Sequence, residues 1–119
     1  MKYTEEHEWL RLEGQVAVVG ITEHAAEQLG DLVFVELPEI GTEVSKDDEV
    51  VVIESVKAAS DILAPLSGKI LEVNESIVED PSLVNSDPAG QGWFFKIEVQ
   101  DMGALDTMMS KDEYDKFIS

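Results

Sequence analysis

The sequence contains no cysteine. A chain without cysteine has no disulfide framework, no thiolate metal site and no cysteine nucleophile. Its two histidines, His7 and His24, lie far apart without the spacing of metal ligands, and we interpret both as ordinary surface or boundary residues. We also find no nucleophile paired with a base, no metal-binding cluster and no phosphate-binding loop. The sequence therefore predicts neither an independent enzyme nor a metal site.

Basic residues are scarce, with 8 lysines and arginines against 26 acidic residues and a formal net charge of -18. Such a surface repels phosphate backbones and anionic lipid headgroups, so we expect no nucleic-acid or membrane partner. Two interpretations of the charge stay open, namely solubility alone and steering toward basic patches on partner proteins. No apolar run approaches the roughly 18 residues that span a bilayer. Residues 1–6 are too acidic and polar for a signal or transit peptide, which predicts a cytoplasmic protein.

The length of 119 residues is typical of one domain, and a hydrophobic fraction of 44% is enough for a core. Apolar and polar residues alternate with a period of two through the first two thirds of the chain. This pattern predicts short strands over residues 7–12, 15–21, 32–37, 50–53, 58–63, 69–73 and 93–99.

Helix signals are few. Thr22 is a suitable N-cap for a short helix that Gly30 ends, and residues 82–84 leave room for one helical turn. Ser110 and Glu113 form a capping box that opens a helix in the tail. We therefore predict a mostly β sandwich or flattened barrel over residues 1–99, followed by a helical tail over residues 100–119, together forming one domain.

The segment between two of these strands lacks a conventional turn residue. If Val56 and Lys57 form a two-residue turn, Glu54 faces Ala59 and Val52 faces Asp61. Tight hairpins favour Asn, Asp or Gly at their centre because the backbone there adopts positive φ, so a β-branched Val beside a Lys predicts a strained turn. Local rules are broken most often where function demands it.

That function would be the presentation of Lys57. A lysine at a hairpin tip holds its amine in solvent, and Lys57 is the only basic residue between Lys46 and Lys69. An ordinary lysine, with a pKa of roughly 10.4, is protonated at neutral pH and is a poor nucleophile, which favours modification by another enzyme. The alternative is an unmodified exposed lysine in a looser four-residue turn. The residues alone leave both interpretations open.

The segment from Glu54 to Ala58 resembles the lipoylation site of the glycine cleavage H-protein family, and the resemblance covers nearly the whole chain. Gly41 lies sixteen residues before Lys57 and Gly68 eleven after it, as in lipoyl domains generally. Further motifs match in order at the family's spacing: His7-Glu8-Trp9, Gly20-Ile21-Thr22, Gly30-Asp31, Leu66-Ser67-Gly68, Val73-Asn74 and Gly92-Trp93-Phe94. Biotinyl modules typically have Met on both sides of their lysine, so Val56 and Ala58 argue against biotin.

The resemblance implies a fold and a role. The fold is a lipoyl-domain-like barrel-sandwich hybrid of two small antiparallel sheets, with a short internal helix and a C-terminal helix. Lipoate would be joined by an amide bond to Lys57, and the chain would be a non-catalytic carrier. It would accept an aminomethyl group when a pyridoxal-phosphate glycine decarboxylase acts on glycine, pass it to a folate-dependent aminomethyltransferase, and be reoxidised by dihydrolipoyl dehydrogenase. Without a signal or transit peptide, we expect a bacterial cytoplasmic protein. A shuttle that visits three active sites is best served as a monomer, which we expect here.

The resemblance also implies roles for four other residues. Glu8 and Asp61 match acidic positions of a groove in which the family's loaded arm docks, and the alternative for each is a solvated carboxylate. Glu54 and Gly68 match positions that lipoylating enzymes of the family read. For Gly68 we favour a second interpretation, a backbone conformation that only glycine adopts cheaply.

The aromatic residues have a simpler interpretation. We expect Trp9, Trp93, Phe94 and Phe95 to be core and sheet-packing residues and not a ligand cage.

The sequence is also compatible with three rival roles. The nearest is an H-like lipoate donor or carrier that acts outside glycine cleavage. The second is a lipoyl domain of an acyltransferase, against which the Thr22–Gly30 helix and the capped tail argue. The third is a plain structural domain with an unmodified Lys57.

Overall fold

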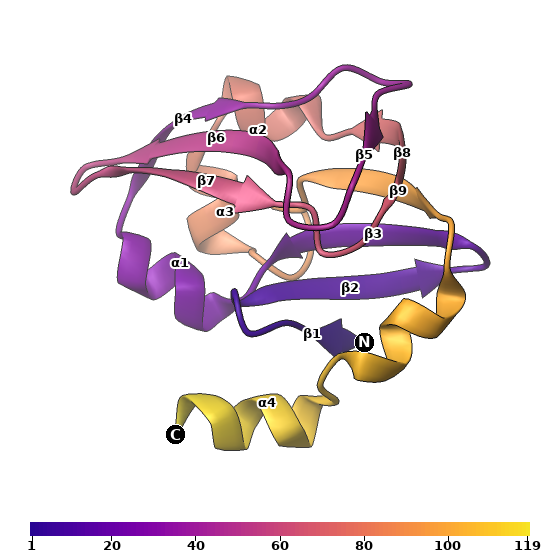
Figure 1. Cartoon of the computed structure of the whole chain (residues 1–119). Coiled ribbons are helices and arrows are strands. Elements are labelled where there is room, and N and C mark those ends of the chain that lie inside the picture. Colours follow the sequence, from indigo (N-terminus) through magenta and orange to yellow (C-terminus); the bar gives the residue numbers. More distant parts are fainter.

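The computed structural model describes residues 1–119 and contains two antiparallel sheets (Figure 1). The large sheet has the strand order β1-β2-β3-β9-β8-β5, and the small sheet has the order β4-β6-β7. The strands are β1 (Lys2–Tyr3), β2 (Glu8–Glu13), β3 (Val16–Ile21), β4 (Leu32–Glu36), β5 (Glu43–Val44), β6 (Glu49–Ser55), β7 (Ala59–Leu63), β8 (Gly68–Val73) and β9 (Phe95–Val99). The predicted mostly β fold with two antiparallel sheets is confirmed.

Short helices connect and flank the sheets. They are α1 (Glu23–Leu29), α2 (Glu75–Glu79), α3 (Ser82–Ser86), the 3-10 helix η1 (Met102–Thr107) and α4 (Lys111–Ile118). The predicted caps are present: the Thr22 hydroxyl accepts the Ala25 N–H at the start of α1, and Ser110 and Glu113 form a capping box at α4. None of these helices has the length and apolar character needed to cross a bilayer.

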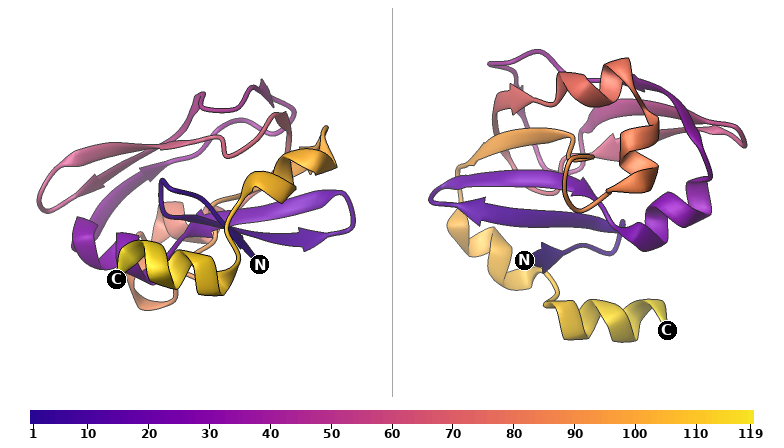
Figure 2. Two further views of the ribbon diagram at one scale, coloured as in Figure 1. Left: turned by 60° about the horizontal axis from the view of Figure 1, so that its bottom comes forward. Right: turned by 180° about the vertical axis from the view of Figure 1, so that it is seen from behind.

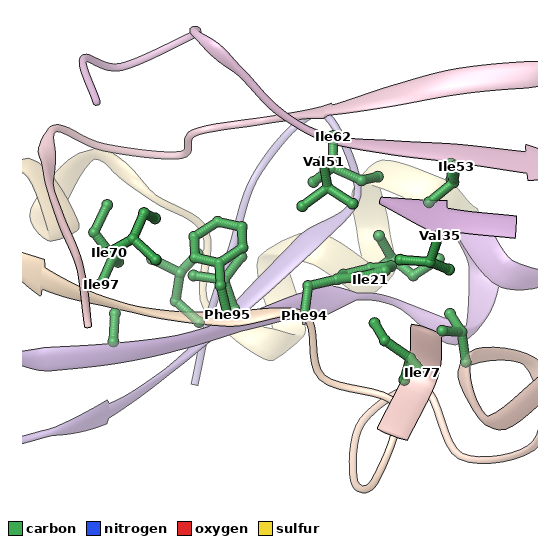
Figure 3. Close-up of a cluster of buried hydrophobic side chains, with 14 of the residues drawn as sticks. Ile21, Val35, Val51, Ile53, Ile62, Ile70, Ile77, Phe94, Phe95 and Ile97 are labelled. Atoms are coloured by element: carbon green, nitrogen blue, oxygen red, sulfur yellow. The ribbon is translucent and has the colours of Figure 1, made fainter. Parts of the chain in front are cut away.

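The core lies between the two sheets (Figure 3). Its largest fully buried side chains include Phe94 and Phe95, which lie among isoleucines and valines contributed by both sheets. Trp9 is buried in a smaller cluster, where its ring covers Gly20 so closely that a Cβ there would lie 2.5 Å from the ring. Trp93 is half-buried against that cluster. The prediction that these aromatics pack within the protein is confirmed.

The prediction of structure differs from the fold in several places. The strands β1 and β5 have two residues each and were missed, because a period of two cannot be recognised over two residues. The helix α2 was also missed, although Asn74 accepts the Ser76 N–H as its N-cap. The last strand begins at Phe95 and not at residue 93, because Asn74 binds the backbone carbonyl of Trp93 outside the sheet ladder.

The β6–β7 hairpin projects beyond α1 at one end of the molecule in all views, whereas α4 lies against the β1 side (Figures 1 and 2). The tip of this hairpin contains Lys57. The small sheet therefore holds the Lys57 turn away from the body of the protein.

Candidate functional site

The hairpin that carries Lys57 has the register that its sequence predicts. Glu54 pairs with Ala59, and Val52 pairs with Asp61. The Ser55 N–H donates to the Ala58 carbonyl over 2.9 Å, which leaves Val56 and Lys57 as the two residues of the turn. Lys57 is exposed at the tip.

The turn is stabilised by the Ser55 side chain. Its Oγ accepts the N–H of Lys57 at 3.1 Å and the N–H of Ala58 at 3.2 Å. Only His7 and Asp47 have positive φ among the non-glycine residues, so the prediction of a strained, left-handed turn at Val56-Lys57 is wrong. Because a side-chain oxygen satisfies these backbone donors, the turn does not need the mirror-image geometry that favours Asn or Gly.

The tip rests on the C-terminal end of α1. The Val56 N–H donates to the Asp31 carbonyl over 3.0 Å, and Lys57 Nζ lies 3.5 Å from the Gln28 carbonyl oxygen. Gly30 has φ 78°, and a Cβ there would lie 3.3 Å from Lys57 Cε. A cation is favoured beside the carbonyls that end a helix. The side-chain amine of Lys57 is thus held by one long hydrogen bond and remains accessible.

Glu8 is buried, with an exposed fraction of only 3%. It is the first residue of β2 and lines a pocket of about 370 Å³ with residues of the N-terminal segment, Leu63 to Pro65, and the chain around η1. Burial raises the pKa of the Glu8 carboxyl to about 7, with Glu6 and Asp47 adding to the rise, while the Thr4 hydroxyl and the Leu63 N–H oppose it. The Thr4 hydroxyl donates to Glu8 Oε1 over 3.1 Å. Glu8 is therefore a protonatable acid in a pocket and not a solvated surface carboxylate.

Asp61 lies elsewhere, exposed on β7. Its pairing partner Val52 is exposed while Val51 and Ile53 are buried, so Asp61 lies on the outer face of the small sheet. Asp61 is not among the residues that line the Glu8 pocket, but Leu63, two residues further on the same face, is. The outer face of β7 therefore leads from the hairpin tip past Asp61 to the edge of this pocket.

Glu54 and Gly68 have contrasting surroundings. Glu54 is exposed on β6, three residues before Lys57. Gly68 is buried at the start of β8, where a Cβ would collide with the backbone carbonyl of Glu98 and lie 2.8 Å from a side-chain carbon of Ile97. Gly68 has no positive φ, so close approach to β9, and not an unusual backbone conformation, explains the need for glycine there.

A polar cluster that was not predicted from the sequence joins the two ends of the chain. Tyr114 of α4 places its hydroxyl 2.8 Å from His7 Nδ1 and 2.7 Å from Thr22 Oγ1, and the rings of His7 and His24 lie 5.0 Å apart. Burial and the neighbouring His24 lower the pKa of His7, against the effect of Glu6. His7 and Tyr114 are 107 residues apart in sequence, and no local pattern signals such a contact.

Comparison with known proteins agrees with this geometry. A family model described as the glycine cleavage H-protein matches residues 1–119. The glycine cleavage system H protein of Thermotoga maritima is 56% identical over 116 residues, which cover 98% of this chain and 94% of that protein. The corresponding protein of Carboxydothermus hydrogenoformans is 49% identical over 118 residues, covering 99% and 91%.

A solved structure gives the same result. The crystal structure of a glycine cleavage system H protein from Mycobacterium marinum matches with a TM-score of 0.89 at 39% sequence identity, covering 98% of this chain and 94% of that one. The chain belongs to the glycine cleavage H-protein family.

Proposed function

We propose that this chain is the lipoyl carrier protein of the glycine cleavage system, with lipoate joined by an amide bond to Lys57, and that it has no catalytic activity of its own. The observation that carries the proposal is the position of Lys57 at the tip of a projecting hairpin in a chain of this family. A carrier must present its reactive group to several enzymes in turn, and a hairpin tip is accessible from most directions.

The surroundings of Lys57 suit an attached arm. Ala58 and Ala59 follow it and are exposed, so little side-chain volume surrounds the amine. The single long hydrogen bond from Lys57 Nζ to the Gln28 carbonyl is lost at small cost when the amine becomes an amide. The turn itself depends on Ser55 and not on the lysine side chain, so modification leaves the hairpin intact.

We further propose that the arm docks along β7 toward Glu8. A bound lipoyl group supplies a disulfide that takes up the aminomethyl group derived from glycine. An extended lipoyl-lysine spans roughly 14 Å from its Cα. Asp61 is four residues along β7 from Lys57, roughly 13 Å away in an extended strand. The end of the arm therefore reaches Asp61, two residues before the Glu8 pocket begins at Leu63.

The two carboxylates would hold a cationic amine in this groove. Asp61 is exposed, and Glu8, whose pKa is about 7, becomes ionised most readily when a positive charge lies beside it. A charge-assisted hydrogen bond from the amine to Asp61 would hold the loaded end beside the pocket, where Glu8 would add a second negative charge. Glu8→Ala and Asp61→Ala should leave lipoylation of Lys57 intact and accelerate loss of the loaded group. Unchanged release rates in both variants would contradict docking of the loaded arm near these carboxylates.

The partners proposed for this carrier are the pyridoxal-phosphate glycine decarboxylase, the aminomethyltransferase, dihydrolipoyl dehydrogenase and a lipoylating enzyme, which it would visit as a monomer. Reconstitution of glycine–bicarbonate exchange with the decarboxylase tests the role. The lipoylated protein should support exchange, and Lys57→Arg should not. A fully lipoylated protein that supports no exchange would instead identify an H-like lipoate donor acting outside glycine cleavage.

A further inference from the structure

A short segment between α1 and β4 supports the turn that carries Lys57. It consists of Gly30, Asp31 and Leu32, the last of which begins β4, and we call it the α1–β4 link. The Asp31 carbonyl accepts the Val56 N–H over 3.0 Å, so one backbone hydrogen bond joins the link to the turn. The link leads into the edge of the small sheet, because β4 is an outer strand in the order β4-β6-β7.

The other edge of the link is bound by a single side chain, that of Asn85 in α3. Its Nδ2 donates to the Gly30 carbonyl over 2.8 Å, and its Oδ1 accepts the Leu32 N–H over 2.9 Å. In extended backbone, the carbonyl of one residue and the N–H of the residue two further on point to the same edge, and the groups of the residue between them point to the opposite edge. Asn85 therefore holds one edge of the link while Asp31 binds the turn on the other.

The Asn85 amide takes the place of a neighbouring strand. A backbone peptide group offers an edge strand one donor and one acceptor, and a side-chain amide offers the same pair. Both groups of the link are satisfied only when the amide oxygen faces the Leu32 N–H and the amide nitrogen faces the Gly30 carbonyl. An isosteric aspartate would keep the shape of this side chain and lose the donor.

Asn85 belongs to a helix that is anchored in the core. The helix α3 contacts both α1 and β4 (Figure 2), and its Val84 is fully buried. The Asn85 side chain is half-buried, which shields its two hydrogen bonds from competition by water. A continuous set of contacts therefore runs from the core through Asn85 and the α1–β4 link to the turn at Val56 and Lys57.

The direction of the turn determines where an arm on Lys57 can lie. A tilt of about 20° at the turn would move the end of an arm roughly 14 Å long by roughly 5 Å. A displacement of that size breaks any hydrogen bond at the end of the arm. We therefore infer that Asn85 is a positioning residue for the lipoyl arm, which acts through the α1–β4 link and fixes the direction in which the arm leaves Lys57. This inference rests on the proposed attachment of lipoate and docking of the arm toward Glu8, and Asn85 itself does not line the Glu8 pocket.

The first measurement is amide hydrogen exchange in the unmodified full chain, followed by NMR. Asn85→Ala should increase exchange of the Val56 N–H at least about tenfold, because the link that accepts it is released. Asn85→Asp should do the same, because a carboxylate oxygen would replace the donor that faces the Gly30 carbonyl. The Phe94 N–H, which binds the Val19 carbonyl over 2.8 Å, reports any change in global stability.

Asn74→Ala is the matched control. The Asn74 amide also binds backbone at both ends, donating to the Gln91 and Trp93 carbonyls and accepting the Ser76 N–H, but it binds no residue of the link. Its loss should increase exchange of the Phe94 N–H by lowering global stability and leave exchange of the Val56 N–H within about twofold.

The second measurement is the rate at which the protein releases its aminomethyl group after lipoylation of Lys57 and loading by the decarboxylase with glycine. Release from Asn85→Ala and Asn85→Asp should be at least about threefold faster than from the original protein, because the end of the arm loses its hydrogen bond. Release from Asn74→Ala should be unchanged. A purely structural role of Asn85 would affect stability alone and would not separate it from Asn74.

Glu8→Ala separates this inference from the proposed docking of the arm. Faster release from Glu8→Ala together with normal release from both Asn85 variants would overturn the inference and leave the docking proposal intact. Unchanged exchange of the Val56 N–H in the Asn85 variants, or an equal increase in Asn74→Ala, would also overturn it. Failure of the original protein to accept lipoate on Lys57 would refute the carrier itself and the positioning role with it.

Discussion

The two sheets differ in the balance and pairing of their charged residues. The strands of the large sheet contain five acidic and four basic residues, and Lys96 and Arg11 contact Glu13 and Glu72 at 3.7 to 4.0 Å. The strands of the small sheet contain four acidic residues, no basic residue and no salt bridge. The large sheet is nearly neutralised within itself, whereas the charge of the small sheet is left for partners.

The sheets also differ in what they bury. Tyr3, Trp9 and Phe95 are buried strand aromatics of the large sheet, whereas Phe34, the only aromatic of the small sheet, is exposed. Aromatic side chains bury the most apolar area per residue and contribute most to a core. The comparison indicates that the large sheet is the scaffold and that the small sheet presents Lys57. Each of the following predictions tests this division.

The largest effect is expected in the scaffold. Gly68→Ala should lower the free energy of unfolding by about 2 to 3 kcal/mol, because its Cβ would meet the Glu98 carbonyl of β9. Urea unfolding followed by circular dichroism measures this. Gly14→Ala is the control, since nothing lies within 4 Å of a Cβ there and only its φ of 68° is unfavourable, at about 1 kcal/mol. If Gly68→Ala is as stable as the original protein but is lipoylated slowly, Gly68 is a recognition residue and not a packing residue.

The second effect on the free energy of unfolding is expected where the two sheets meet. There, Glu8 of β2 and Leu63 of β7 line the same pocket. The folded protein raises the pKa of Glu8 from 4.5 to about 7, so between these values it binds more protons than the unfolded chain. The contribution of Glu8 to stability is therefore present below about pH 4.5 and is lost as the pH rises to about 7. The loss should amount to about 2 to 3 kcal/mol.

Comparing the original protein with Glu8→Gln isolates this dependence. The difference in their free energies of unfolding, measured in urea at pH 5 and pH 8, should shift in favour of Glu8→Gln at the higher pH. Because both proteins keep His7 and every other titratable group, those contributions cancel. A difference that does not vary between the two pH values would show that Glu8 titrates normally.

A smaller effect is expected where the tail meets the scaffold. Tyr114→Phe removes the hydroxyl that contacts His7 and Thr22, and should lower the free energy of unfolding by about 1 to 2 kcal/mol. Tyr3→Phe is the matched control, because the Tyr3 ring stacks on Tyr114 at 4.9 Å but its hydroxyl contacts only the Met1 sulfur at 3.9 Å. Thermal unfolding of both variants makes the comparison. Equal stability of the two would mean that the hydroxyl cluster does not hold α4.

The smallest effect is expected on the small sheet. Glu36→Gln and Glu54→Gln should change the free energy of unfolding by no more than about 0.5 kcal/mol, because both carboxylates are exposed and unpaired. Lys96→Gln, which loses contacts with Glu13 and Glu72, should cost somewhat more, up to about 1 kcal/mol. A destabilisation of 2 kcal/mol or more in either glutamate variant would mean that the small sheet depends on its charges for folding.

The small sheet and its hairpin were easier to predict from the sequence than the contacts of the large sheet. The pairing of Glu54 with Ala59 across the hairpin was predictable, because a two-residue turn fixes the register of both strands. The reason the turn tolerates Val56 was not, because it depends on where the Ser55 hydroxyl points. Local periodicity therefore located the hairpin and its lysine, and the resemblance supplied the cofactor.

Contacts between residues that are distant in sequence could not be predicted from local patterns. The burial of Glu8 depends on Leu63 and η1, which are distant in sequence, and its sequence neighbours Glu5 and Glu6 suggest a solvated surface. The contact of His7 with Tyr114 likewise needs the tail folded back against β1. Only the resemblance groups Asp61 with Glu8, because no local pattern relates an exposed position on β7 to a carboxylate buried in the neighbouring pocket.

The central claim, that Lys57 carries lipoate, is tested most directly by mass spectrometry. The intact mass of the protein produced in lipoate-competent cells is measured first, and peptide mapping then locates any adduct. The account predicts one lipoyl increment on Lys57, absent from Lys57→Arg and retained in Lys46→Arg, which alters another exposed lysine. No increment, even with lipoate and a purified lipoylating enzyme supplied, or an increment that survives Lys57→Arg, would contradict it.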